Sequence, residues 1–231
     1  MLPWLRTLED FPPVNHALVA PSGLLAAGGS LSTDWLIAAY ARGIFPWFNP
    51  GQPILWWSPD PRMVLFPPAL HVPHSLQRVM RKRGYEIRVD TAFAEVMQAC
   101  SAPRTDQTGS WISPEMVAAY TALHQLGLAH SIETWIDGTL AGGLYGVALG
   151  RIFYGESMFA RVNDASKIAF VHLVRQLQQW QFELIDCQMN TAHLARFGAV
   201  EISRAAFVRL LPRGLQAPAP TWHFDPNTGA V

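Results

Sequence analysis

The fold is decided by residues 130–160, which read HSIETWIDGTLAGGLYGVALGRIFYGESMFA. Aromatic and β-branched side chains recur through this stretch, as is typical of strands. Asp137-Gly138 and Leu149-Gly150 interrupt it at two places, and such pairs favour tight hairpin turns. We therefore predict three antiparallel strands joined by two short turns.

The chain that follows alternates between helix and strand. Residues 163–180 carry apolar side chains at helical spacing and begin with Asn163 or Asp164 as a cap, which predicts a long helix. Residues 182–189, FELIDCQM, predict a buried strand. Upstream and downstream, strands are predicted at 63–66, 85–89 and 200–203, with helices at 75–84, 90–100, 113–127, 191–197 and 203–211. Such an order predicts an α/β (α+β) fold with a mixed sheet.

The N-terminal residues 1–61 differ in composition from the rest. They are rich in Pro, Gly and Trp, and they hold one clear helical segment, which begins after Ser32 and ends before Gly43. Residues 44–62, IFPWFNPGQPILWWSPDPR, are too aromatic for a solvated linker, so we interpret them as a packed loop that lines something. We predict a small lobe over 1–61 and a larger domain over 62–231, with a loose tail after Pro218.

Composition excludes several classes of protein. Lys plus Arg equals Asp plus Glu at 17 each, so the net charge is zero and a globally basic nucleic-acid binder is excluded, although a local patch is not. Two cysteines cannot build a disulfide framework. No apolar run approaches the roughly 20 residues of a membrane span, and no coiled-coil pattern is present. We expect a soluble cytoplasmic monomer that does not contact a membrane.

The strand at 182–189 carries the first candidate site. Strict alternation would put Asp186 and Gln188 on one face, and Ile185 and Cys187 on the other. A carboxylate and an amide inside an apolar strand need partners, because a lone buried charge is costly. A purely structural polar pair is an equally good interpretation of this spacing.

Glu156 is the second candidate, because it lies in an aromatic and nearly uncharged strand. Alternation predicts that it shares a face with Tyr154 and Met158. Such a carboxylate could bind or deprotonate an amine. The alternative is a salt bridge, for instance to Lys167.

Two further patterns suggest nucleic acid. Trp47 and Trp111 could each stack on a base, although a tryptophan more often fills a core. A basic cluster could bind phosphates or could be a solvated helix end; it comprises Arg78, Arg81, Lys82 and Arg83. His71 and His74 lack a clear third ligand, so we predict no metal site.

Several motifs together resemble one family. They are GLLAAGGSLSTDWLIAAYARGIFPWF, PILWWSPDPRMVLFP, HSIETW, GGLYG, GESMF, ASKIA and LIDCQM, between about Gly23 and Arg204. This set closely resembles the bacterial leucyl/phenylalanyl-tRNA–protein transferases. The resemblance implies transfer of Leu or Phe, and less readily Met, from aminoacyl-tRNA to the α-amino group of proteins with N-terminal Arg or Lys. The product is marked for N-degron proteolysis. It also implies a GNAT-like catalytic domain and no metal or cofactor.

The same resemblance implies residue roles. Asp186 and Gln188 would lie at the reacting centre, with Asp186 binding the acceptor amine and Glu156 assisting. Trp47 and Trp111 would hold the 3′-terminal adenosine of the tRNA. The aminoacyl side chain would enter a pocket formed by Leu144, where the family often has Met, together with Met158 and Ile185. The basic cluster at 78–83 would meet acceptor-stem phosphates.

Two other functions compete with this one. A GNAT-like enzyme that uses acyl-CoA needs backbone amides around a pyrophosphate, usually in a glycine-rich turn, and residues 158–170 contain no glycine. A non-catalytic RNA-binding module would leave Glu156, Asp186 and Gln188 unexplained. For the enzyme, we expect Asp186→Ala to lower transfer while leaving the fold and tRNA binding largely intact.

Overall fold

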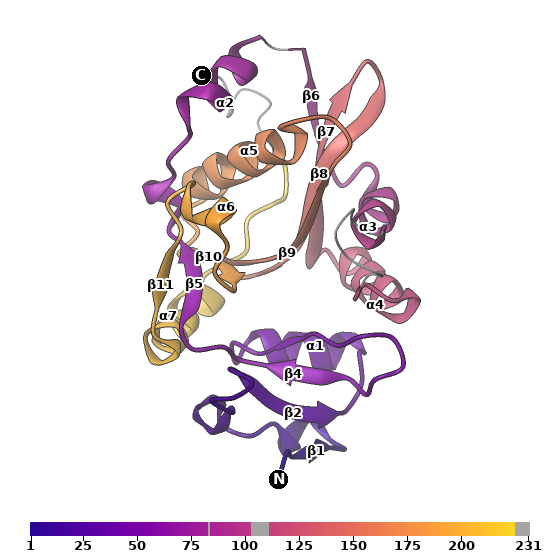
Figure 1. Ribbon diagram of the computed structural model, residues 1–231, viewed down its shortest axis with the longest axis vertical. Coiled ribbons are helices and arrows are strands. Elements are labelled where there is room, and N and C mark those ends of the chain that lie inside the picture. Colours follow the sequence, from indigo (N-terminus) through magenta and orange to yellow (C-terminus); the bar gives the residue numbers. More distant parts are fainter. Residues whose placement is uncertain (83, 103–110, 225–231) are drawn as a thin grey trace.

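The computed structural model describes residues 1–82, 84–102 and 111–224 and contains two sheets (Figure 1). The smaller sheet lies in the N-terminal part, with strand order β1-β2-β4-β3. Its strands are β1 Trp4–Leu5, β2 Leu24–Gly28, β3 Phe45–Pro46 and β4 Leu55–Trp57, and helix α1, Thr33–Tyr40, follows β2. Two 3₁₀ turns, Leu8–Asp10 and Val14–His16, link β1 to β2. These elements form the N-terminal lobe.

The larger sheet has seven strands in the order β11-β5-β10-β9-β8-β7-β6. Its centre consists of the three antiparallel strands predicted from residues 130–160, which are confirmed as β7 Ala129–Ile136, β8 Thr139–Leu149 and β9 Ile152–Ala160. The remaining strands are β5 Arg62–Leu65, β6 Glu86–Val89, β10 Leu184–Gln188 and β11 Val200–Ile202. Together with the small sheet, this confirms the mixed α+β class.

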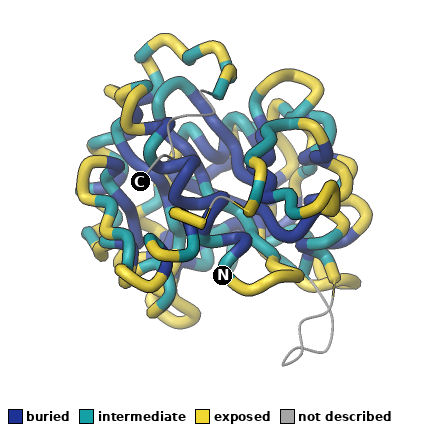
Figure 2. The backbone as a smooth tube through the Cα atoms, turned by 90° about the horizontal axis from the view of Figure 1, so that it is seen from above, coloured by how far each residue is buried: buried dark blue, intermediate teal, exposed yellow. Residues whose placement is uncertain are grey.

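Helices cover both faces of the large sheet (Figure 1). Helix α5, Ala165–Gln179, packs on one face of β7–β9, while α3, Phe93–Ser101, and α4, Pro114–Gln125, pack on the other. The shorter helices are α2 His74–Arg81, the 3₁₀ turn Pro67–Ala69 and α6 Ala192–Ala195; α7, Arg204–Gln216, is longer than predicted. Figure 2 shows that buried segments run through the middle of the molecule and that exposed segments lie around them.

The large sheet opens between two of its strands. β9 and β10 are parallel and pair only from Ile152 with Leu184 to Tyr154 with Asp186. Beyond that point β9 stays with β8, whereas β10 stays with β5. Each of these two strands also contains a bulge next to the opening. Unpaired strand ends therefore face one another at the centre of the sheet.

The structure corrects two predictions about irregular segments. Residues 44–62 are not one loop, because β3 and β4 pair there and the indole N–H of buried Trp56 donates to the Gly28 carbonyl at 2.9 Å. The C-terminal tail is not loose over its described part. Trp222 stacks on the His130 ring at a centroid distance of 3.6 Å, and it packs edge-on against Trp180. Aromatic burial therefore holds a segment that its prolines suggested was free.

No helix in the described ranges 1–82, 84–102 and 111–224 has both the length and the apolar character that crossing a membrane requires.

Candidate active site

A cavity of about 1030 Å³ lies at the opening between β9 and β10. Most of the predicted site residues line it, from both sheets and from the segment before α4: Trp47, Trp111, Leu144, Glu156, Met158, Ile185 and Gln188. Asp186 and the described members of the basic cluster, Arg78, Arg81 and Lys82, do not line it. The structure therefore brings together side chains that are up to 141 positions apart in the sequence, from residue 47 to residue 188.

One wall of the cavity is apolar and belongs to the α5 side of the sheet. Leu144 and Met158 are paired across β8 and β9, and Ile185 of β10 is almost fully buried beside them. Phe170 and Leu173 of α5 complete this wall. A branched or aromatic side chain would lose water and gain dispersion contacts here, whereas a charged one would lose its hydration.

The two predicted tryptophans also line the cavity. Trp47 follows β3 and is 37% exposed, and its ring meets the Trp57 ring at 5.4 Å in an edge-on arrangement. The Trp57 indole N–H donates to the Trp47 carbonyl at 2.6 Å, which fixes the backbone there. Trp111 is half-buried just before Ser113, whose hydroxyl accepts from the Met116 N–H and caps α4. Both rings thus border the cavity from anchored backbones.

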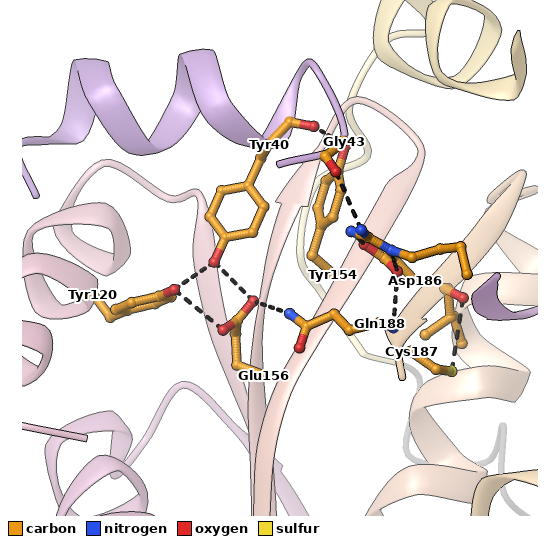
Figure 3. A network of polar contacts seen from close by, with 10 residues as sticks. Tyr40, Gly43, Tyr120, Tyr154, Glu156, Asp186, Cys187 and Gln188 are labelled. Carbon is orange, nitrogen blue, oxygen red and sulfur yellow. Dashed lines mark hydrogen bonds and ion pairs between the residues drawn. The ribbon is translucent and has the colours of Figure 1, made fainter. Parts of the chain in front are cut away.

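Glu156 is the only carboxylic acid among the described residues that line the cavity. Its two oxygens accept hydrogen bonds from the Tyr40 hydroxyl at 2.8 Å and the Tyr120 hydroxyl at 3.1 Å (Figure 3). The Gln188 side-chain amide also donates to it, at 3.1 Å. The tyrosine hydroxyls also contact each other. The predicted salt bridge to Lys167 is wrong, because Lys167 pairs with Asp164 at 2.6 Å.

A bulge in β9 explains why Glu156 points where it does. Ser157 pairs with Tyr145 and Gly155 pairs with Gly146, so Glu156 is one residue more than its partner strand can match. Tyr154 and Met158 consequently pack in different core clusters. The prediction that Glu156 shares a face with both is therefore wrong, because a bulge breaks the alternation on which it rested.

The neutral, protonated form of Glu156 is favoured more strongly than in a solvent-exposed glutamate. Burial is the main cause, and it raises the pKa of this carboxyl to about 7. The hydrogen bonds from Tyr40 and Tyr120 act in the opposite direction, Asp186 adds to the rise, and Arg62 opposes it. A carboxyl with a pKa near 7 can both lose and accept a proton at neutral pH. Such a group could bind or deprotonate an amine.

Asp186 lies behind the cavity wall in a buried ion pair. Its oxygens accept from the Arg62 guanidinium at 2.7 Å and 2.6 Å, and neither side chain is exposed. The remaining Arg62 N–H group donates to the Gly43 carbonyl at 3.2 Å (Figure 3). The guanidinium lies between the Phe45 and Phe207 rings, at 4.8 and 4.6 Å. The structural interpretation of Asp186 therefore describes its contacts well.

Gln188 is linked to Asp186 through the backbone. Its N–H donates to the Asp186 carboxylate at 2.9 Å, and its φ of 63° lies in the left-handed region. A bulge between Asp186 and Gln188 sets two residues against one on β5. The expected shared face is therefore wrong: Asp186 turns toward Arg62, whereas the Gln188 amide reaches Glu156.

Sequence reasoning missed four residues of this site. Arg62, Tyr40 and Tyr120 hold the two carboxylates, and Tyr145 lines the cavity with a buried hydroxyl that has no hydrogen-bond partner among the described residues. Arg62 carried a usable signal, because it is a cation at the start of an apolar strand. The tyrosines carried none, since an aromatic residue on an apolar helix face normally indicates core.

The basic cluster lies on α2 and its C-terminal end. Arg78, Arg81 and Lys82 are exposed, and Arg83 lies outside the described residues. α2 packs on α5, on the side away from the N-terminal lobe (Figure 1). This leaves the cluster free to meet a large ligand, and its role stays a prediction. Among the described residues, no three His, Cys, Asp or Glu side chains are grouped as they would be around a metal ion.

Comparisons with known proteins agree with the resemblance. Residues 64–212 match the model of the leucyl/phenylalanyl-tRNA protein transferase family, and residues 29–60 match the N-terminal domain of the same family. Similar curated proteins bear the name leucyl/phenylalanyl-tRNA–protein transferase. The one from Nitrosomonas europaea is 63% identical and covers 96% of both chains, and the one from Nitrosospira multiformis is 64% identical and covers 91% of both.

Likeness to solved structures is weak. A GCN5-related N-acetyltransferase from Kribbella flavida aligns with 72% of this chain and 60% of its own, at a TM-score of 0.36 and 12% identity. The family match covers more than half of the chain, and the curated relatives are similar over nearly their whole length. The chain therefore belongs to the leucyl/phenylalanyl-tRNA–protein transferase family of aminoacyltransferases.

Proposed function

We propose that the protein transfers Leu or Phe, and less readily Met, from aminoacyl-tRNA to the α-amino group of proteins that begin with Arg or Lys. The observation that carries this proposal is one cavity with an apolar wall, two tryptophans and the Glu156–Gln188 pair. Products of such a reaction would be marked for N-degron proteolysis, and a tRNA donor implies a cytoplasmic reaction.

The donor end of the cavity fits an aminoacyl-adenosine. Trp47 and Trp111 offer ring faces for the terminal base, at roughly 1–3 kcal/mol per stacked base. The apolar wall, with Leu144, Met158 and Ile185, fits a branched or aromatic aminoacyl side chain. Arg78, Arg81 and Lys82, with Arg83, would contact phosphates of the acceptor stem.

The Glu156–Gln188 pair would bind the amine of the acceptor protein. The ester of an aminoacyl-tRNA is already activated, so the protein mainly has to orient the two substrates. The acceptor nitrogen attacks the ester carbonyl carbon, a C–N bond forms, and the bond to the ribose oxygen breaks. A protonated amine loses two protons overall: one passes to the ionised Glu156 carboxylate before the attack, and the other ends on that ribose oxygen. Glu156 would receive the cationic amine, and Gln188 would orient it, while Asp186 fixes Gln188 from behind.

A transfer assay tests the proposal. Leu-tRNA carrying radiolabelled leucine is mixed with a peptide beginning with Arg, and label in the peptide is counted. The same peptide with an acetylated N-terminus and a matched peptide beginning with Ala are the controls. Label in the free Arg peptide alone is the expected result. A folded sample that labels none of them contradicts the proposal, and CoA binding would then be measured.

The tryptophans are tested through donor affinity. Trp111→Ala is expected to raise the KM for Leu-tRNA about ten-fold, because one stacking contact is lost. Trp180→Ala is the matched control, since Trp180 does not line the cavity. An unchanged KM in Trp111→Ala would contradict the assignment of the adenosine site.

A further inference from the structure

Two buried tyrosines hold Glu156 without lining the cavity themselves. Tyr40 of α1 and Tyr120 of α4 are at most 1% exposed. Each hydroxyl donates to a different oxygen of Glu156, at 2.8 Å and 3.1 Å, and the two hydroxyls contact each other. Neither tyrosine lines the cavity, so neither is placed to contact a substrate. Their hydroxyls reach the cavity through Glu156.

The three groups form a triangle that suits either protonation state. When Glu156 is ionised, each hydroxyl proton points to one carboxylate oxygen. When Glu156 is protonated, its own proton can point to Tyr40, the Tyr40 proton to Tyr120, and the Tyr120 proton to the other carboxyl oxygen. A hydroxyl both donates and accepts, so the two patterns differ by one proton on Glu156 and by a rotation of the Tyr40 O–H bond. No buried polar atom of the triangle is left unpaired in either state.

Tyr40 brings the N-terminal lobe into this arrangement. Its backbone carbonyl accepts from the Tyr154 hydroxyl at 2.9 Å, and the Gly43 carbonyl, just past the end of α1, accepts from Arg62 (Figure 3). Arg62 in turn holds Asp186. The C-terminal end of α1 therefore contacts, directly or through one residue, both acidic side chains of the site.

We propose that Tyr40 and Tyr120 are positioning residues that let Glu156 gain and lose a proton inside the site, and that the N-terminal lobe takes part in the reaction through Tyr40. The proposal rests on the proposed function and deepens it. It assigns the lobe a chemical part in acceptor binding, because a cationic amine is received by the ionised form of Glu156.

Other groups that face Glu156 must be considered in a pH experiment. They are Arg62 of β5, Tyr145 of β8, and Asp186 and Gln188 of β10. His193 lines the same cavity, and burial, followed by Lys167 and Arg196, lowers its pKa from the ordinary value. The acceptor's own α-amino group titrates near pH 8. A Glu156→Gln variant separates these titrations from that of Glu156.

The test is the pH profile of kcat/KM for the Arg peptide in Tyr40→Phe and Tyr120→Phe. Wild-type kcat/KM is expected to rise with pH through about 7, as Glu156 ionises. Each hydroxyl favours the carboxylate, so its removal is expected to move this rise toward higher pH and to lower kcat/KM about ten-fold at neutral pH. Tyr85→Phe is the matched control, because its hydroxyl bonds to His172 outside the site.

The Glu156→Gln background distinguishes positioning from a general structural effect. Adding Tyr40→Phe to Glu156→Gln is expected to leave the shape of the profile unchanged, because only the titrations of the amine and of the other groups named above remain. An unmoved profile in both single variants, at wild-type thermal midpoints, would overturn the proposal. So would an equal shift in the Glu156→Gln background.

A separate measurement keeps the proposal apart from the proposed function. If the wild-type protein transfers no amino acid, the proposed function is contradicted. The role of the tyrosines is then tested by NMR titration of the ¹³C-labelled glutamate side chains in the free protein. A Glu156 signal whose midpoint rises in Tyr40→Phe and Tyr120→Phe supports the triangle. A midpoint that stays fixed contradicts it, whatever the transfer assay gives.

Discussion

At the residue scale, the Arg62–Asp186 pair changes what a substitution of Asp186 should do. Asp186→Ala would leave a fully buried guanidinium without its carboxylate partner. Breaking one side of such a pair typically costs about 3–5 kcal/mol. We therefore expect Asp186→Ala to lower the free energy of unfolding by about that amount in urea titrations, in addition to lowering transfer. The expectation that the fold is left largely intact no longer follows.

The double variant Arg62→Met with Asp186→Leu is the control for this prediction. It removes both charges from the interior, so it is expected to recover at least half of the stability lost by Asp186→Ala. Transfer should stay low, because the Gln188 N–H then lacks the Asp186 carboxylate that accepts its hydrogen bond. A double variant as unstable as the single one would show that the unpaired charge is not the cause.

Glu156 gives a pH-dependent prediction of stability. Its pKa is raised from 4.5 to about 7 on folding, so the folded protein binds the proton more tightly than the unfolded chain. The stability that this group contributes is fully present below pH 4.5 and is lost as the pH rises through 7. Between pH 5 and pH 8, wild type is expected to lose stability relative to Glu156→Gln in urea titrations. A constant difference between the two proteins over that range would contradict the shifted pKa.

At the scale of elements, Glu133 of β7 anchors the start of α3. Its fully buried carboxylate accepts from the backbone N–H groups of Thr91 and Ala92 at 3.0 and 2.8 Å, and from the Trp135 indole at 3.0 Å. Glu133→Ala would remove the acceptor of the buried Ala92 N–H and the buried Ser131 hydroxyl, at a cost of about 3 kcal/mol or more. Glu86→Ala, at the exposed first position of β6, is the control, and it should change the free energy of unfolding by no more than about 0.5 kcal/mol.

The same scale shows where sequence patterns succeed and where they fail. The strands of residues 130–160 follow from alternation and turn pairs, and α4 follows from Ser113 and Pro114, because these signals are local. The bulges at Glu156 and Gln188 do not follow, since a bulge depends on how two strands align. The prediction of which face of the sheet Glu156 and Gln188 occupy was therefore wrong, although the strands that carry them were predicted correctly.

At the scale of the whole molecule, the described part of the C-terminal tail packs on the α5 side of the sheet through two aromatic rings. Trp222 stacks on His130, and Phe224 packs edge-on against Trp180 at 5.6 Å. Trp222→Ala is expected to cost about 2 kcal/mol in urea titrations, since a half-buried aromatic ring is lost. His223→Ala, at the exposed neighbouring position, should have almost no effect. Equal effects of the two would contradict a specific role for the ring.

Contacts across the molecule were the least predictable part of the site. The apolar wall and the tryptophans could be assigned because the family resemblance named their positions, and the structure brings them to one cavity. Tyr40 with Glu156 and Arg62 with Asp186 could not be paired, because these residues lie 116 and 124 positions apart. No local sequence pattern predicts a contact between residues that are so far apart along the chain.

The position of β5 also has a consequence for how the protein is made. β5 is synthesised early, yet its neighbours in the sheet are β10 and β11, which leave the ribosome more than a hundred residues later. At 5–20 residues per second, Arg62 waits on the order of ten seconds before Asp186 exists. The cavity, which Ile185, Cys187 and Gln188 of β10 help to line, therefore cannot form until this later part of the chain has been synthesised.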